Sequence, residues 1–312
     1  MCRSETWKAK RMRPESATRE ASLAPEIALL VLLSFLWGGS FTLIKLAVAT
    51  IPPVSMVAAR VTVAALLLLL FVRWRGMALP RDKRSRRALF IQGLLQSALP
   101  FTLISWSEQH IASGLAGVLN ATPPIFAVLI ALAARTEPVT TRKIAGVLLG
   151  IAGVVVITGG VQGIGRAPLS ELAVLGSSLC YAVAPLWGQR FSHLPAAVTA
   201  AGAMSGASVL MLPAALWLDH PWTLSPSWPS LAALAVLAVV CTALAMIIFF
   251  RLVRSLGSLG TNSGSYLRAG FSVLLGAVVL GESFTWMTLA GMALILLGTA
   301  AINAPWRRAG HR

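Results

Sequence analysis

Long apolar runs, separated by short polar connections, fill the chain from about residue 27 onward. Each run is about 20 residues long, which is the length an α-helix needs to cross the hydrocarbon core of a bilayer. Ten such runs can be drawn, at 27–46, 54–72, 88–107, 113–134, 144–160, 170–189, 196–217, 230–250, 257–280 and 286–303. The pattern therefore predicts an all-α integral membrane protein with ten transmembrane helices.

The composition favours a bilayer over water as the main solvent. Of the 312 residues, 57% are hydrophobic and 12% are charged, whereas about a quarter of the residues in a soluble domain carry a charge. The three cysteines, Cys2, Cys180 and Cys241, are too scattered for a disulfide framework and form no CxxC pair. A pair of soluble domains and a disulfide-rich fold are both excluded.

The lysines and arginines fall in alternate connections. Together the N-terminal tail, the connections 73–87, 135–143, 190–195 and 251–254, and the C-terminus carry 22 of the 26 basic residues. The remaining connections carry only Arg166. Because basic residues gather in cytoplasmic loops, we expect both termini to be cytoplasmic, with tails at 1–26 and 304–312.

The net charge of +16 raises the possibility of a nucleic-acid partner. The positive charge is, however, spread from loop to loop in step with the predicted topology and is not gathered on one domain. We therefore expect no nucleic-acid partner. The basic connection 73–87 is expected to contact anionic lipid headgroups.

An internal repeat appears when the sequence is shifted by 145 residues. The shift lays 126–157 on 271–302, where ten of 32 positions are identical, among them Gly146 with Gly291 and Gly153 with Gly298. Each unit holds five spans, so the second unit must enter the membrane from the opposite side. Such inverted repeats are typical of secondary transporters. We predict one five-helix repeat at 27–160, a linker at 161–169 and a second repeat at 170–303.

Several stretches carry the marks of a known family. They are LLSFLWGGSFTLIKLA, with Trp37-Gly38, and IPPVSMVAARVTVAALLLLL, with Arg60, followed by Pro124 with Glu137 and by Gly281-Glu282. From about 27 to 303 the chain resembles the EamA-like branch of the drug/metabolite transporter superfamily. The resemblance implies two EamA domains and export of small metabolites or drugs across the bacterial inner membrane.

The second half departs from this family in one respect. Members often have a proline in the second half aligned with Pro124, and here that position is Ala269. We therefore expect span nine to differ from span four, in which the pair Pro123-Pro124 removes helix hydrogen bonds. Unwound backbone is tolerated at membrane depth only where it faces protein or a wet cavity.

Arg268 is the strongest candidate for a binding residue. It lies about halfway along span nine, and the 145-residue shift places it opposite Pro123. An arginine at the bilayer centre costs at least ~2.5 to 3.5 kcal/mol, so we expect it to point into a central cavity. Two roles are open: a clamp for a carboxylate or phosphate, or a structural arginine that caps free carbonyls.

Other candidates have interfacial or structural alternatives. Tyr266 and Asn120 lie near the midplane and are predicted to face the cavity, whereas Trp37 and Arg60 are candidates for either the cavity or the membrane interface. Lys45 is expected to anchor the outer end of span one. Glu137 and Glu282 are expected to be symmetric structural caps.

The absence of acidic residues from the middle of the predicted spans suggests the substrate class. Glu26, Glu108, Glu137, Glu171 and Glu282 all flank spans, and none lies deep in one. A carrier of cations needs a buried carboxylate, so a positive interior favours amino acids or organic anions. We predict a secondary active exporter that works by alternating access. The alternatives are a drug or other small-molecule efflux carrier and an integral membrane transferase.

Enzyme motifs are missing from the sequence. It contains no GxxxxGK[ST], HExxH or GxSxG, and its four histidines are dispersed. We therefore expect no catalytic activity, cofactor or metal. Small-residue spacings at 146–150, 202–206 and 260–264 allow close helix packing, either within one chain or in a homodimer.

Overall fold

The computed structural model describes residues 15–133, 140–157, 167–255 and 264–303, with the side chains of 15–23, 253, 254, 266 and 303 outside the description. The described residues form helices and connections, without a strand. In the part of the chain that the structure describes, seven helical segments are long and apolar enough to cross a membrane: Ala24–Ala47, Pro53–Trp74, Lys83–Ser107, Ser113–Ala133, Pro168–Phe191, Ala196–Leu218 and Trp228–Leu252. Two shorter apolar helices are Leu267–Leu280 and Trp286–Ile302.

The helices follow one another in a simple order. They are α1 (Glu15–Ala47), α2 (Pro53–Trp74), α3 (Lys83–Gly93), α4 (Leu99–Ser107), α5 (Ser113–Leu119), α6 (Pro123–Ala133), α7 (Thr141–Ile157), α8 (Pro168–Gly188), α9 (Ala196–Leu218), α10 (Trp228–Ala238), α11 (Ala245–Ser255), α13 (Gly264–Leu280) and α14 (Trp286–Asn303). Short 3₁₀ turns lie at Gln189–Phe191 and Pro221–Thr223. Each of the ten predicted ranges overlaps one of these helices or a pair of consecutive helices.

Two π-helical turns lie within long apolar helical segments of the described structure. The turn η1 (Leu94–Ala98) joins α3 to α4, and the turn η4 (Val239–Leu244) joins α10 to α11. Their first residues are 145 positions apart, the same offset that relates the two halves of the sequence. A π-turn places one extra residue in the helix and is often found at functional sites.

Local sequence explains where several helices begin. Proline occupies the first position of α2 and α8, where its missing N–H would have no helical partner. The carboxylate of Asp82 accepts a hydrogen bond from the Ser85 N–H at 2.6 Å at the start of α3. This bond holds the pKa of Asp82 below its usual value.

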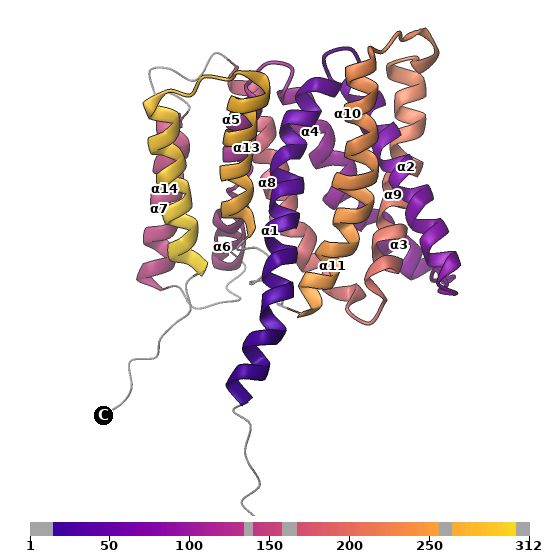
Figure 1. The fold of residues 1–312 in the computed structure, drawn as a ribbon, viewed down its shortest axis with the longest axis horizontal. Helices are drawn as coiled ribbons and strands as arrows, with labels where there is room; N and C mark the ends of the chain where they lie inside the picture. Colours follow the sequence, from indigo (N-terminus) through magenta and orange to yellow (C-terminus); the bar gives the residue numbers. More distant parts are fainter. Residues whose placement is uncertain (1–14, 134–139, 158–166, 256–263, 304–312) are drawn as a thin grey trace, which may run out of the picture.

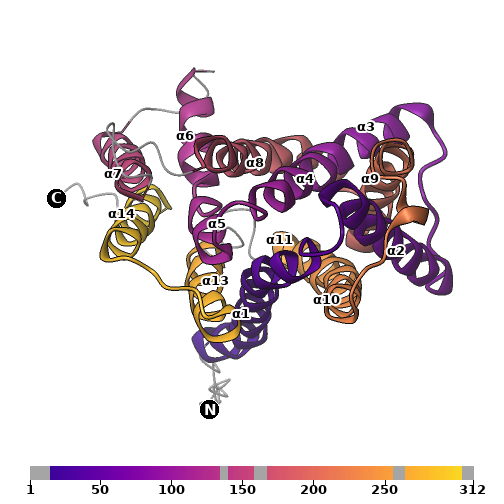
Figure 2. The same cartoon turned by 90° about the horizontal axis from the view of Figure 1, so that it is seen from above.

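The helices pack as one bundle. Figure 2 shows α1, α13, α5, α8, α4 and α11 around the centre, the pair α7 and α14 at one edge, and α2, α9 and α3 toward the other. Large apolar side chains on the outside are exposed, including Leu70 (64%), Leu148 (62%) and Val278 (73%). Exposed apolar surface of this extent suits contact with lipid tails rather than water.

Two ends of the bundle can be distinguished in Figure 1. The connections 48–52, 108–112, 219–227 and 281–285 lie at what we call the upper end. The start of α1, the end of α14 and the connections 75–82 and 192–195 lie at the lower end.

The glycines of α7 and α14 bring these two antiparallel helices into close contact. A Cβ atom at Gly146 would lie 2.6 Å from the carbonyl oxygen of Gly298, and one at Gly298 would lie 2.5 Å from that of Gly146. Gly153 and Gly291 are related in the same way, at 2.7 Å in both directions. The 145-residue offset converts one of these pairs into the other.

The other small-residue spacings also pack within the chain where they are described. Gly150 lies against Ile125, and Gly202 and Gly206 lie against Leu89 and Phe90. The spacing 260–264 extends outside the described residues. Packing within the bundle therefore accounts for the spacings at 146–150 and 202–206.

Candidate functional site

A cavity of about 90 Å³ lies in the middle of the bundle, between α1, α2, α4, α8, α11 and α13. A water molecule needs roughly 10 to 15 Å³ of such space, so several would fit. Its polar lining consists of Ser34, Ser40, Arg60, Gln96, Asn120, Tyr181, Ser265 and Arg268, and its aromatic lining includes Trp37, Phe41, Phe101 and Phe249. None of the described lining residues is Asp, Glu or Lys.

The break between α5 and α6 shapes one wall of this cavity. In a continuous helix the carbonyls of Leu119 and Asn120 would accept hydrogen bonds from the residues four positions later, which are Pro123 and Pro124. Neither proline has an N–H to donate. The Leu119 carbonyl instead accepts bonds from the hydroxyls of Thr122 at 2.7 Å and Ser178 at 3.3 Å.

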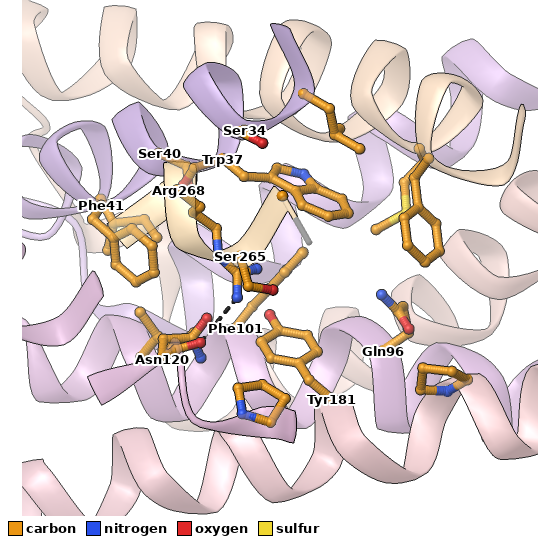
Figure 3. A pocket seen from close by; sticks show the side chains of 18 of the residues that line it. Ser34, Trp37, Ser40, Phe41, Gln96, Phe101, Asn120, Tyr181, Ser265 and Arg268 are labelled. Atoms are coloured by element: carbon orange, nitrogen blue, oxygen red, sulfur yellow. Dashed lines mark hydrogen bonds between the residues drawn. The ribbon is translucent and has the colours of Figure 1, made fainter. Parts of the chain in front are cut away.

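Arg268 supplies the donor that the second carbonyl lacks. Its Nη2 donates to the main-chain oxygen of Asn120 at 2.9 Å, as Figure 3 shows. Its guanidinium carbon lies 6.0 Å from the centre of the Trp37 ring. The buried Nε has no hydrogen-bond partner among the described residues. Helix α13, described from Gly264 to Leu280, is continuous through this position, so the break between α5 and α6 has no counterpart at Arg268.

The side chain of Asn120 is held by α8. Its Nδ2 donates to the hydroxyls of Ser177 at 3.0 Å and Ser178 at 3.5 Å, and the residue is 1% exposed. In Figure 3 the ring of Tyr181, also on α8, points its hydroxyl toward the region of the Arg268 guanidinium. Helix α8 therefore orients the carbonyl that Arg268 binds and supplies a further polar group nearby.

Arg60 lies inside the bundle and does not reach the membrane interface. It is 2% exposed, and its Nε donates to the hydroxyl of Thr242 in η4 at 2.7 Å. Its guanidinium stacks 4.0 Å above the ring of Phe101. The buried Nη1 has no partner among the described residues. The cavity therefore contains two guanidinium groups, each with one buried nitrogen that has no hydrogen-bond partner among the described residues.

Five of the predicted site residues line the same cavity: Trp37, Arg60, Asn120, Pro123 and Arg268. Pro124 is buried in the first turn of α6 and does not line it. The side chain of Tyr266 lies outside the described residues.

Sequence reasoning missed Gln96 and Phe101, which also line the cavity. A signal for the first was present, because Gln96 is a polar residue in the middle of an apolar run. The sequence contained no such signal for Phe101, because aromatic residues are common in apolar runs.

Hydrogen bonds link neighbouring segments at the upper end of the bundle. The Lys45 ammonium donates to the main-chain oxygens of Glu108 and, at 2.8 Å, Ile111. The Glu282 carboxylate accepts the N–H groups of Ser113 at 2.6 Å and Gly114 at 3.0 Å, and so caps α5. Glu282 is thus a structural cap, and Glu137, its predicted counterpart, lies outside the described residues. Lys45 binds protein carbonyls instead of anchoring at the interface.

At the lower end an ion pair joins α1 to α11. The Arg251 guanidinium lies 2.9 Å from the Glu26 carboxylate, which also accepts a hydrogen bond from Ser255 at 2.8 Å. Because the Arg251 side chain is 58% exposed, this pair contributes little to stability.

Comparison with known proteins gives consistent results. A family model described as the EamA-like transporter family matches residues 24–159 and 168–304. The chain is 28% identical over 288 residues to the uncharacterized inner membrane transporter YedA of Escherichia coli K12, covering 91% of this chain and 92% of YedA.

Another relative has a more specific name. It is the probable terminal-alkyne amino-acid exporter of Streptantibioticus cattleyicolor, which is 26% identical over 286 residues, covering 90% of this chain and 94% of the relative. A solved structure titled only as a crystal structure of a protein superimposes with a TM-score of 0.63 at 20% identity, covering 89% of this chain and 97% of that one. That likeness concerns the fold alone.

Proposed function

This chain belongs to the EamA-like transporter family, and from this premise we propose that it is a secondary active transporter that exports small organic anions, amino acids among them, by alternating access. Transport by a membrane protein agrees with the named relatives and with the apolar helices. The substrate class and the mechanism are our proposal.

The observation that carries the proposed substrate class is the unbalanced positive charge of the cavity. Arg60 and Arg268 both line it, and each has a buried donor without a partner among the described residues. No described lining residue is a carboxylate. A guanidinium binds a carboxylate through parallel hydrogen bonds, and leaving a buried donor unpaired is costly. A substrate carboxylate would satisfy both requirements.

The aromatic lining suits the apolar part of such a substrate. Trp37, Phe41, Phe101 and Phe249 surround the polar groups, and pockets for small molecules combine mostly apolar walls with a few placed polar groups. The exporter from Streptantibioticus cattleyicolor is named for an amino acid, which has the carboxylate that this reading requires.

We further propose the ten-helix architecture of two inverted five-helix repeats, with a linker at 161–169. Two structural features support it. The π-turns η1 and η4 begin 145 residues apart, and the contact between Gly146 and Gly298 maps onto the contact between Gly291 and Gly153 under the same offset. A pseudo-twofold axis between the repeats would produce both relations.

We assign the lower end to the cytoplasm and the chain to the inner membrane. Arg73, Arg75, Arg81 and Arg190 lie at or beside the lower connections, as expected of cytoplasmic loops. Both termini would then be cytoplasmic, and basic residues of 73–87 would meet anionic headgroups. The upper end, where Lys45 and Glu282 bind main-chain groups, would face the periplasm and would open during export.

A drug efflux carrier is the nearest alternative. Carriers of cationic drugs need an acidic group in the binding site, which the described lining does not supply. A membrane transferase that works through a bound metal is less favoured, because no group of three or more His, Cys, Asp or Glu placed to hold a metal ion is found among the described residues.

The test is counterflow in proteoliposomes loaded with unlabelled amino acids or organic acids. Saturable uptake of the matching labelled compound is expected for the native chain, and Arg268→Ala is expected to abolish it. Arg190→Ala is the matched control, because Arg190 stacks on Trp187 at 3.9 Å and does not line the cavity. Flux that never saturates would indicate a pore, and unchanged counterflow in Arg268→Ala would remove Arg268 from the site.

A further inference from the structure

Glu108 is a buried acidic residue that the proposed site does not use. It follows the last residue of α4, Ser107, and is 0% exposed. Its N–H donates to the carbonyl of Ile104 at 2.9 Å, and Ile104 lines the cavity. Glu108 is therefore one helical turn above the cavity, toward the upper end.

Neither oxygen of the Glu108 carboxyl has a hydrogen-bond partner among the described residues. The nearby donors are already engaged. Lys45 donates to the main-chain oxygens of Glu108 and Ile111, and the N–H groups of Ser113 and Gly114 bind the carboxylate of Glu282. A carboxylate ion in this position would be buried without a hydrogen bond from the described residues, which is a costly arrangement in a protein.

Charged groups face Glu108 from three neighbouring elements. Lys45 on α1 and Arg60 on α2 favour its ionised form, whereas Glu282 in the connection 281–285 opposes it. Two further titratable groups, one close in sequence and one on a neighbouring helix, lie near Glu108. His110 is two residues on and exposed, and Glu171 on α8 follows Ser170, whose carbonyl accepts the Ser107 hydroxyl at 2.8 Å.

The balance favours the protonated acid. Glu108 lies in the upper connection, outside the membrane-spanning helices, and burial raises the pKa of its carboxyl well above its usual range, against the attraction of Lys45. A neutral acid costs far less to bury than an ion. The geometry and the chemistry therefore agree.

We propose that Glu108 is a proton-binding site in the upper gate, taking up a proton from the upper side when that end closes over the cavity and releasing it when the end opens to water. The gating step rests on the proposed alternating access, whereas the buried protonated acid does not. Because Glu108 holds its proton more tightly in the closed state, closure is favoured below the pKa of the open state. This preference is lost as pH rises through the pKa of the closed state.

The proton itself can be detected without any substrate. Infrared difference spectra of the purified full chain in nanodiscs, recorded across a pH titration, should show the carbonyl stretch of a protonated carboxylic acid at neutral pH. Glu108→Gln should remove this band, and Glu26→Gln, which removes the acid of the Arg251 ion pair, should leave it unchanged. A wild-type chain without the band, or a band that survives Glu108→Gln or disappears in Glu171→Gln instead, overturns the proposal.

The gate is tested by labelling at the upper end. In a chain with Cys2, Cys180 and Cys241 replaced, Ile111→Cys would report on a buried position of the gate, and His110→Cys on an exposed neighbour. The ratio of labelling at 111 to labelling at 110 by an impermeant maleimide should rise with pH, by at most about tenfold per pH unit for one proton.

Variants at the acid complete the test. The pH dependence of this ratio should persist in Glu108→Asp, which keeps the carboxyl group, and should be lost in Glu108→Gln. Size-exclusion profiles establish that each variant is folded. An equal pH dependence in Glu108→Gln overturns the proposal. If the infrared band and the labelling behave as expected but no substrate shows counterflow, the proposed export fails while the proton site stands.

Discussion

Arg268 on α13 donates a hydrogen bond to the main-chain carbonyl of Asn120 at 2.9 Å, across 148 residues of sequence. The bond uses Nη2 and leaves Nε without a described partner. The two roles expected for this arginine, a cap for free carbonyls and a clamp for an anion, are therefore compatible, because different nitrogens of one guanidinium can serve them.

Arg268→Lys should lose transport while the protein still reaches the membrane. A lysine keeps the positive charge but lacks the planar fork that can bind Asn120 and a carboxylate together. Counterflow or cellular tolerance to inhibitory amino acids measures the loss, with Arg190→Lys as the control outside the cavity. Native activity in Arg268→Lys would mean that positive charge alone suffices and that simultaneous binding of Asn120 and a carboxylate is not required.

A double-mutant cycle can isolate the structural role of Arg268. Arg268→Ala should destabilise the fold by about 1 to 3 kcal/mol, because the Asn120 carbonyl loses its donor. In a Pro124→Ala background residue 124 regains an N–H, so the same substitution should cost less, with a coupling of about 0.5 to 3 kcal/mol. Unfolding in detergent by denaturant measures both costs. Equal costs in the two backgrounds would show that this bond contributes nothing.

Thr242→Val should weaken substrate binding more than it weakens the fold. The hydroxyl of Thr242 accepts a hydrogen bond from the Nε of Arg60 at 2.7 Å and donates one to the carbonyl of Leu237 at 2.7 Å. Without this hydroxyl the Arg60 guanidinium is no longer held in one orientation. We expect a raised half-saturation concentration in counterflow and a loss of stability of about 1 kcal/mol.

Thr62→Val is the matched control for this substitution. Thr62 pairs with Ser208 at 2.7 Å and does not line the cavity. Equal transport defects in the two valine variants would argue against a role for Thr242 in orienting Arg60.

Gly146→Ala and Gly298→Ala should each separate α7 from α14. The new methyl group would approach a backbone carbonyl within 2.6 Å or 2.5 Å, and relieving such overpacking costs about 1 to 3 kcal/mol. Thermal melting in detergent measures the effect. Gly270→Ala, where nothing lies within 4 Å, should be neutral or slightly stabilising because alanine favours helix. Three similar melting temperatures would contradict the described contact.

The proposed orientation predicts which connections meet the periplasm. In a cysteine-free background, Ser225→Cys in the upper connection 219–227 should react with an impermeant maleimide on intact cells. Ala78→Cys in the lower connection 75–82 should react only after the cells are opened. Labelling of both positions from the same side would exclude the arrangement described here.

The sequence alone predicted the features that depend on local chemistry. Apolar run length gave the helices, and the absence of N–H groups at Pro123 and Pro124 gave the broken backbone near the middle of the fourth run. The cost of a guanidinium in lipid gave the inward position of Arg268. Each of these follows from a few neighbouring residues.

Other features depend on contacts between distant segments and could not be predicted in this way. Whether Arg60 faced the interface or the cavity was decided by Thr242, 182 residues later. Glu108 sits beside a helix end in the sequence, yet it is fully buried, with Lys45, 63 residues earlier, bound to its main-chain oxygen. Gln96 was recognisable as a polar residue in an apolar run, but the π-turn that contains it has no residue signature.

The π-turn η1 has a consequence for how this protein tolerates length changes. Gln96 and Phe101 are five residues apart and both line the cavity, a spacing that a regular α-helix would splay by roughly 140°. Removing one residue from 94–98 would restore regular winding and rotate everything beyond it by about 100°. Phe101 would then leave Arg60, on which it stacks. A single codon deleted at 94, 95, 97 or 98, in an otherwise ordinary apolar stretch, would distort the cavity without removing any residue that lines it.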